Sequence, residues 1–279
     1  MTNDFWRQPK EWEMDIYSKI VELKKENRNF ITVSVVKSTG STPGKAGFKM
    51  VVDHEGKTYG TVGGGAIEME AIQESKRLMA SGEENLLKEY LLSNDEKIIN
   101  PKVTVVPMSC NGKIWLYYEF ERNLPVIYIF GGGHVGQALI EIMSKLKYHV
   151  ILIDNRQELF EKNKAKGINC IYMEYKDFVE QFIPADDSYF VAVTYGHLFD
   201  YEILKTLYSR NLVKKYIGII ASRAKAAAMI NNLKNEIDAG IDLSKLHMPI
   251  GLKIGGDTAY EIALSIAAEI QSVRYEKKI

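Results

Sequence analysis

One short apolar run followed by a glycine loop constrains the fold of this chain more than any other feature. The run is Val126-Ile127-Tyr128-Ile129-Phe130, and the loop after it is Gly131-Gly132-Gly133-His134-Val135-Gly136. A Gly-x-Gly-x-x-Gly pattern is weak evidence alone, but here it follows a predicted strand and opens a predicted helix at 135–146. We therefore predict a Rossmann-type domain that binds a dinucleotide through residues 131–136.

The three glycines of the pattern and an acidic residue have separate expected roles. Gly131 allows the tight turn, Gly133 lets the backbone approach a pyrophosphate, and Gly136 lets the helix pack closely on the strand. Asp154 ends the next predicted strand, 149–154, about 20 residues beyond the loop. An acid there accepts hydrogen bonds from ribose hydroxyls and disfavours a 2′-phosphate, so the sequence favours an unphosphorylated ribose.

The chain after the loop alternates apolar runs with helical stretches, which is typical of a parallel α/β sheet. The predicted strands are 126–130, 149–154, 169–173, 188–193 and 216–220. The predicted helices are 135–146, 159–166, 176–182, 199–209 and 222–234. Thr258 with Glu261 forms a capping box, which predicts a last helix over the apolar run 262–270.

The first part of the chain has a different, mixed pattern that predicts an α+β domain. Helices are expected near 13–26 and 66–79, and strands at 30–36, 49–53, 57–62, 86–92, 103–106 and 114–120. The polar stretch 38–47 is expected to be a loop. Residues 121–125 are the best linker, so we predict an N-terminal domain at 1–122 and a Rossmann-like domain at 123–279.

Composition excludes several classes of function. The chain has 279 residues, 46% of them hydrophobic, with 36 basic and 36 acidic side chains and a formal net charge of zero. A neutral chain has no bulk field for nucleic acid, and no run reaches the ~20 apolar residues of a membrane span. We therefore expect a cytoplasmic protein. Its only cysteines, Cys110 and Cys170, are far apart and predict neither a disulfide framework nor a zinc site.

Further polar residues follow predicted strands at the sheet edge where open α/β folds bind ligands. His134 begins the helix after the glycine loop, where an imidazole contacts a phosphate or is merely exposed. His197 follows the fourth strand of this domain, with a helix-capping turn as the alternative reading. Ser222-Arg223 follows the fifth, and an arginine fork suits a phosphate or a pterin carbonyl, or a surface ion pair.

Motifs along nearly the whole chain resemble the XdhC/CoxI family of xanthine dehydrogenase accessory proteins. In the first domain they are Val35-Val36-Lys37-Ser38-Thr39-Gly40-Ser41-Thr42-Pro43, Gly60-Thr61-Val62-Gly63-Gly64-Gly65 and Met108-Ser109-Cys110-Asn111-Gly112. In the second they are the 131–136 loop, residues 216–223 and Pro249-Ile250-Gly251-Leu252-Lys253-Ile254-Gly255-Gly256.

The resemblance implies a two-domain chaperone, with a homodimer as a reasonable assembly. Such a chaperone binds molybdenum cofactor, as molybdopterin or its dinucleotide, assists its sulfuration and delivers it to a xanthine dehydrogenase-type hydroxylase. A cysteine desulfurase is a candidate second partner. The resemblance adds Gly63, Gly64 and Gly65 to the cofactor-binding candidates.

The thiol chemistry implied by the resemblance rests on Cys110. Many relatives have a cysteine after the Gly-Gly-Gly run, where this chain has Ala66, and their Cys-Gly-Gly is Cys110-Asn111-Gly112 here. The chain uses Cys110 alone, uses a partner's thiol, or acts only as a carrier. A thiolate is a soft ligand for a transition metal or sulfur, so Cys110 is the candidate metal ligand and catalytic residue. Glu68 is a second catalytic candidate, as a proton acceptor or ligand-orienting group, against a plain helix-dipole role.

Two rival functions use the same Rossmann domain. One is an NAD-dependent oxidoreductase that binds NAD(P), with His134 or His197 as acid or base. It lacks a Tyr-x-x-x-Lys or similar proton relay in the expected place. The other is a nucleotide-sensing interaction module without turnover.

Overall fold

The computed structural model describes residues 15–94, 103–185 and 187–277. The chain divides into two compact units, residues 1–123 and 124–279. The two units have different sheets and separate cores, and each is described by itself below. No helix of the described residues is long and apolar enough to cross a membrane.

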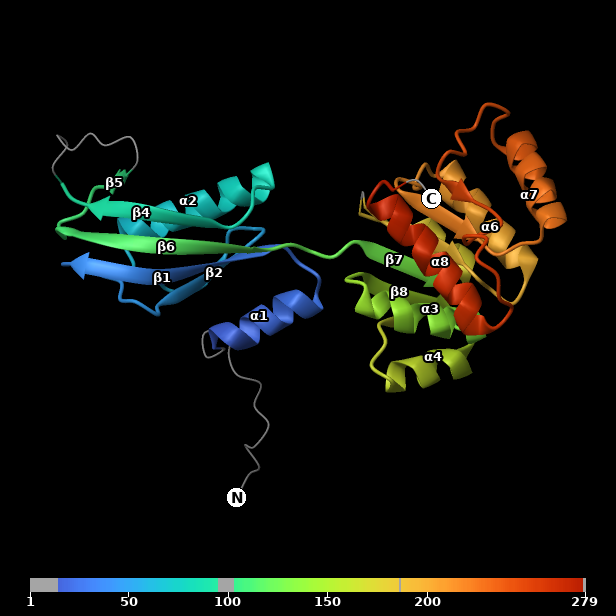
Figure 1. Cartoon of the computed structure of the whole chain (residues 1–279), viewed down its shortest axis with the longest axis horizontal. Helices are drawn as coiled ribbons and strands as arrows, with labels where there is room; N and C mark the ends of the chain where they lie inside the picture. The colour runs from blue at the N-terminus through green and yellow to red at the C-terminus, as the bar shows by residue number, and fades with distance from the viewer. Residues whose placement is uncertain (1–14, 95–102, 186, 278–279) are drawn as a thin grey trace, which may run out of the picture. The chain divides into compact units, whose positions relative to one another are not determined.

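Within its described residues, 15–94 and 103–123, the first unit is a six-stranded sheet with two helices, which confirms the α+β expectation (Figure 1). Its strand order is β3-β2-β1-β6-β4-β5. Pairing is antiparallel except between β4 and β5. In chain order the elements are α1 (Ile16–Lys25), β1 (Phe30–Gly40), β2 (Lys49–Asp53), β3 (Thr58–Gly60), α2 (Ala66–Ser81), β4 (Leu86–Leu92), β5 (Thr104–Val106) and β6 (Gly112–Glu121).

Strand periodicity assigns the two helices of this unit to opposite faces of its sheet. Ile31 and Val33 of β1 belong to a buried cluster with Ile67 of α2. Phe30, one position away, packs with Leu23 of α1. Because successive strand side chains point to opposite faces, α1 and α2 must cover different faces (Figure 1).

The prediction of a loop over residues 38–47 is wrong for its first three residues. Ser38, Thr39 and Gly40 continue β1 and pair with Ile114, Lys113 and Gly112 of β6, after a register shift between Val35 and Lys37. Pairing with a strand distant in sequence explains this extension of β1. The long partner strand β6 extends the hydrogen-bond ladder over residues whose own composition favours a turn.

The second unit is an all-parallel six-stranded sheet with helices on both faces, which confirms the Rossmann expectation (Figure 1). Its order, β12-β11-β10-β7-β8-β9, is that of the doubly wound dinucleotide-binding fold. The elements are β7 (Val126–Phe130), α3 (His134–Lys145), β8 (His149–Asp154), α4 (Gln157–Ala165), β9 (Cys170–Tyr172), α5 (Tyr175–Gln181), β10 (Tyr189–Ala192), α6 (His197–Ser209), β11 (Tyr216–Ile219), α7 (Arg223–Glu236), β12 (Leu246–His247) and α8 (Ala259–Arg274).

Strand β7 lies at the centre of this sheet and is buried throughout. Its Tyr128 and Phe130 face one cluster, with side chains of α5, α6 and α7. Its Ile127 and Ile129 face the other, with side chains of α3 and α8. The chain order reverses between β7 and β10, so the carboxyl ends of these strands form the crevice where this fold binds ligands.

Candidate functional site

The glycine loop of the second unit leaves β7 and enters α3 with almost no room for side chains. Gly131 has φ +106°, and a Cβ on it would lie 2.6 Å from the Val193 carbonyl oxygen. A Cβ on Gly136 would lie 1.9 Å from the Gly131 carbonyl oxygen. Both glycines are therefore required by the fold itself.

Gly133 differs from those two glycines because nothing lies within 4 Å of the place a Cβ would take. It is the N-cap of α3 and has no side-chain hydrogen bond to the first turn of that helix. The first amides of α3 are thus left for an anion, with the helix dipole in favour. His134 begins the helix and is exposed, and Val135 is half-buried beside it.

Asp154 ends β8, as predicted, but its carboxylate faces protein groups. The side chain is 1% exposed. Its Oδ2 accepts a hydrogen bond from the Gly132 amide at 2.6 Å. Both oxygens also accept from the Arg156 guanidinium, from Nε at 2.8 Å and from Nη2 at 2.7 Å. The acid thereby ties the phosphate loop to Arg156. Contact between Asp154 and a ribose stays a prediction.

Arg156 extends from the end of β8 to Tyr195, which follows β10. Its guanidinium lies 4.5 Å from the centroid of the Tyr195 ring. Asn155 donates its Nδ2 hydrogen to the Tyr195 hydroxyl at 3.3 Å. A pocket of about 220 Å³ is lined by residues at the carboxyl ends of the central strands, namely Gly133, His134, Val135, Arg156, Val193, Thr194, Tyr195 and Ile220.

Asp200 fixes the loop that carries Tyr195. Its Oδ1 accepts from the Thr194 amide at 3.1 Å and from the Thr194 hydroxyl at 2.7 Å. Burial raises the pKa of Asp200 above its usual value, against the opposing effect of these hydrogen bonds. The loop is therefore held by a buried acid, so Tyr195 is presented on a fixed backbone.

The other predicted residues of this edge are not among those that line the pocket. His197 is the first residue of α6 and is exposed. Ser222 is the N-cap of α7, and its hydroxyl accepts from the Lys225 amide at 3.3 Å. Arg223 begins α7 and is exposed. His197 and Ser222-Arg223 do follow β10 and β11, as predicted, and their roles in binding stay predictions.

In the first unit, the Glu68 side chain is hydrogen-bonded to the glycine run that precedes α2. Its Oε2 accepts from the Thr61 hydroxyl at 2.7 Å and from the Gly64 amide at 3.0 Å. The Gly63 amide in turn donates to the Thr61 hydroxyl at 3.0 Å. Glu68 therefore orders Gly63 and Gly64, while its predicted role toward a proton or ligand stays a prediction.

Three motif loops of the first unit converge. A Cβ on Gly63 would lie 2.4 Å from the Gly44 nitrogen. A Cβ on Gly65 would lie 3.2 Å from the Met108 side chain. A Cβ on Gly112 would lie 2.4 Å from the Ser41 carbonyl oxygen. Segments 41–44, 63–65 and 108–112, which are far apart in sequence, are thus neighbours.

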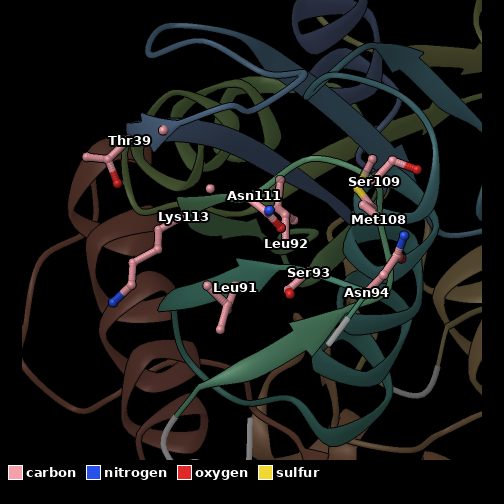
Figure 2. Close-up of a pocket in the computed structure, with 11 residues that line it drawn as sticks. Thr39, Leu91, Leu92, Ser93, Asn94, Met108, Ser109, Asn111 and Lys113 are labelled. Carbon is pink, nitrogen blue, oxygen red and sulfur yellow. The ribbon is translucent and has the colours of Figure 1, made fainter. Parts of the chain in front are cut away.

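Cys110 lies in the last of these loops and is half-buried against the core of the first unit. Its neighbours Ser109 and Asn111 line a hollow of about 870 Å³ (Figure 2). Lys113 also lines this hollow, and its Nζ pairs with Glu89 Oε1 at 2.9 Å. Among residues 15–94, 103–185 and 187–277 there is no cluster of three or more His, Cys, Asp or Glu side chains that could hold a metal ion.

The second cysteine has a different environment in the other unit. Cys170 begins β9, is half-buried, and its Sγ lies 3.7 Å from the Phe160 carbonyl oxygen. Burial raises the pKa of the Cys170 thiol. This favours the unreactive thiol form, as expected of a core cysteine.

The sequence reading missed Arg156 and Tyr195, the two side chains that shape the small pocket. Arg156 offered one signal, because it is a cation two positions after the acid of the second strand. No sequence signal distinguishes Tyr195 from an ordinary surface aromatic residue, because its partner Arg156 is 39 residues earlier in the chain.

Comparisons with curated proteins give two relatives that are longer than this chain. The uncharacterized protein YqeB of Escherichia coli (strain K12) is 26% identical over 263 residues, which is 94% of this chain and 46% of YqeB. A probable xanthine dehydrogenase subunit of Bacillus subtilis (strain 168) is 29% identical over 153 residues, 54% of this chain and 43% of that protein. The chain spans less than half the length of both relatives.

Solved structures give further similarities. A xanthine dehydrogenase from Bacillus halodurans aligns over 95% of this chain and 97% of its own, with 18% identity and a TM-score of 0.48. The NAD(P)-binding domain of an exopolyphosphatase-related protein from Archaeoglobus fulgidus aligns over 39% of this chain and 82% of its own, with 17% identity and a TM-score of 0.34.

Family models match both units of the chain. The model described as the XdhC Rossmann domain matches residues 127–270, more than half of the chain. The model described as the XdhC and CoxI family matches residues 23–90, within the first unit. The chain belongs to the XdhC and CoxI family.

Proposed function

We propose that this protein is an accessory protein of a xanthine dehydrogenase-type molybdenum hydroxylase. In this proposal it binds molybdenum cofactor, assists its sulfuration and delivers it to the hydroxylase. Family membership and the similarity to a probable xanthine dehydrogenase subunit support the link to that class of enzyme. A cysteine desulfurase as sulfur donor and a homodimeric assembly belong to the same proposal.

The convergence of the three motif loops in the first unit is the observation that carries this proposal. Gly65 approaches Met108, and Gly112 approaches Ser41, so the loop of Cys110 contacts residues of the other two motifs. Close packing of this kind supports the loop that carries Cys110, and a carrier of a metal centre requires a supported ligand position. Cys110 is the one cysteine of this unit, since Cys170 lies in the other.

The donors of the chain fit the proposed ligand in part. The open side of Gly133 and the uncapped first turn of α3 suit a phosphate group of a pterin or of an auxiliary nucleotide. Cys110 supplies one soft ligand for molybdenum or its sulfur. When bound, the cofactor supplies the molybdenum centre that the hydroxylase needs. Glu68 acts as a positioning residue in this scheme, because it holds Gly64 and Thr61.

Reconstitution of a hydroxylase that lacks its terminal sulfur tests this proposal. The enzyme is incubated with molybdenum cofactor, a sulfur source and this protein, and its activity is measured. We expect Cys110→Ala to lose most of the restored activity and Cys170→Ala, the matched control, to keep it. Full restoration by Cys110→Ala would mean that the thiol has no role. No restoration by the wild-type protein would reject the accessory function.

The rival oxidoreductase uses the pocket of the second unit, where His134 lines the wall next to Gly133. An oxidoreductase of this kind would turn over NAD(P)H with a small substrate, and its activity would not depend on Cys110. A steady absorbance change at 340 nm with a purified substrate, unaffected by Cys110→Ala, would favour it.

A further inference from the structure

Asp154, the acid at the position where this fold binds a ribose, has no free site to accept a further hydrogen bond. Oδ1 of Asp154 accepts from the backbone amide of Arg156 at 2.9 Å and from its Nε at 2.8 Å. Oδ2 accepts from the Gly132 amide at 2.6 Å and from Arg156 Nη2 at 2.7 Å. An ionised carboxylate has about four lone-pair sites, so all of them are used. With 1% of its surface exposed, Asp154 is also out of reach of a hydroxyl.

The Arg156 guanidinium, and not the Asp154 carboxylate, is accessible in the crevice at the carboxyl ends of the strands. Its side chain is 32% exposed. Its Nη1 donates to no residue that the structure describes, and Arg156 lines the same pocket as Gly133. The Tyr195 ring lies under the guanidinium and Asp154 holds its edge, so the fork is fixed from two directions. A preorganised fork loses little freedom when it binds an oxyanion.

The position of Arg156 determines which oxyanion it meets. In this fold the residues that end the second strand face the ribose next to the adenine, while the pyrophosphate lies on the first helix. Arg156 follows β8 by two residues, and it lines the same pocket as the first residues of α3. The pyrophosphate and the arginine therefore have separate places.

The ion pair at this position removes the repulsion that an unpaired acid at the end of β8 would exert on an added anion. The negative charge of Asp154 is compensated by Arg156 at 2.7 Å. The next carboxylate, Glu174, accepts from Asn155 Nδ2 at 2.9 Å and is exposed to solvent. The acid therefore does not repel a phosphate as an unpaired carboxylate would.

We infer that this crevice selects a nucleotide that carries a phosphate on its ribose 2′-oxygen, with Arg156 as the selecting residue. The inference deepens the proposed function and rests on its claim that the second unit binds a nucleotide. It replaces the expectation from sequence that Asp154 favours an unphosphorylated ribose, because that acid is saturated by Arg156 and Gly132. It points to an auxiliary NADP-type nucleotide in place of a pterin dinucleotide at this site.

Isothermal titration of the full chain with NADP⁺ and NAD⁺ tests the inference, with adenosine 2′,5′-bisphosphate and 5′-AMP as minimal probes. A charge-assisted contact predicts that each 2′-phosphorylated ligand binds about 10-fold or more tightly than its partner. Arg156→Gln should remove this preference by weakening NADP⁺ about 10-fold, while NAD⁺ changes by less than about 3-fold. Arg28→Gln makes the same charge change in the first unit, where Arg28 pairs with Glu26, and should keep the preference.

The outcomes separate this inference from the proposed function. Equal or tighter binding of NAD⁺ to the wild-type protein would overturn the selection and leave nucleotide binding standing. Failure of all four ligands would overturn both the selection and the nucleotide part of the proposed function. If Arg156→Gln does not fold, the wild-type preference alone decides. Arg156→Lys, which keeps the charge and loses the fork, should then show a reduced preference.

Discussion

The Asp154 carboxylate and the Arg156 guanidinium form a two-point ion pair, with Oδ1 to Nε at 2.8 Å and Oδ2 to Nη2 at 2.7 Å. The same Oδ2 accepts from the Gly132 amide, so one buried acid joins the phosphate loop to the exposed arginine of the crevice. The hydrogen bond to Asp154 is the main cause of the raised pKa of Arg156. Disturbing either residue therefore affects both the loop and the crevice.

Replacing Asp154 should destabilise the second unit. Asp154→Ala leaves the buried Gly132 amide without its acceptor and removes the partner of Arg156. We expect a loss of about 2–3 kcal/mol in the free energy of unfolding, measured by urea denaturation with far-UV circular dichroism. Arg156→Gln is the comparison and should cost less, about 1–2 kcal/mol, because the buried carboxylate keeps the Gly132 amide and the backbone amide of residue 156 as donors. Equal costs for the two variants would contradict this account of the pair.

Substitution by alanine should have very different effects on stability at two glycines of the same loop. In Gly136→Ala the new Cβ would lie 1.9 Å from the Gly131 carbonyl oxygen, so we expect a loss of about 3 kcal/mol or more, or no folding. In Gly133→Ala the Cβ meets open space, and φ is −70°, so stability should change by less than about 1 kcal/mol.

Nucleotide affinity gives the second readout for this glycine pair. The open side of Gly133 is where we place the phosphate, so Gly133→Ala should fold normally and bind NADP⁺ at least about 10-fold more weakly. Isothermal titration of the folded variant measures this. Unchanged affinity would mean that no ligand approaches Gly133.

A pair of buried tyrosines in the first unit should show strong energetic coupling. The hydroxyls of Tyr90 and Tyr118 lie 2.5 Å apart and both side chains are fully buried. Burial raises the pKa of both, so each stays neutral and needs its partner. Tyr90→Phe and Tyr118→Phe should each cost about 1–2 kcal/mol, because each leaves one buried hydroxyl unpaired.

The double variant provides the test of this coupling. Replacing both tyrosines by phenylalanine removes both hydroxyls and should cost about 1 kcal/mol less than the sum of the singles. Trp115 lies in β6 and the chain has no tryptophan after it, so tryptophan fluorescence follows the unfolding of the first unit. Additive costs would exclude the hydroxyl pair as a source of stability.

His149 predicts how the stability of the second unit depends on pH. Burial lowers the pKa of this half-buried imidazole below its usual value of 6.5. Below pH 6.5 the unfolded chain therefore binds more protons than the folded one, so stability is full above this pH and falls as the pH decreases through it.

The pH effect of His149 is measured by comparison with His149→Gln. Melting temperatures at pH 7.5 and pH 5.5, followed by circular dichroism, should fall further for the wild-type protein than for the variant. If both fall equally, His149 is not the group responsible.

Local patterns predicted most of the second unit. The strand, loop and helix around Gly131, the acid at Asp154 and the capping box of Thr258 and Glu261 are all formed, because each depends on residues close in sequence. Strand β12 was missed, since Leu246 and His247 are too few to give a periodic signal and are ordered by pairing with β11. The stacking of His247 on Tyr216, 4.5 Å between ring centroids, is likewise a tertiary feature.

The candidate sites were less predictable because they depend on long-range contacts. The sequence singled out residues 63–65 and 108–112 as motifs, but it did not predict that Gly65 lies against Met108. The role of Glu68 toward a proton or ligand stays a prediction, and the sequence did not indicate that its carboxylate accepts from Thr61 and Gly64. The Arg156 to Tyr195 contact joins the ends of two strands that are not adjacent in the chain, and no local pattern encodes such a pair.

The most direct test of the central claim is the content of the protein when it is purified from cells that make molybdenum cofactor. Molybdenum is measured by mass spectrometry of the metal, pterin by fluorescence after oxidation, and nucleotide by chromatography. We predict molybdenum and pterin in near-equal amounts to the protein, both reduced in Cys110→Ala and retained in Cys170→Ala. Tightly bound nucleotide with neither molybdenum nor pterin, under every growth condition, would contradict the proposed accessory role.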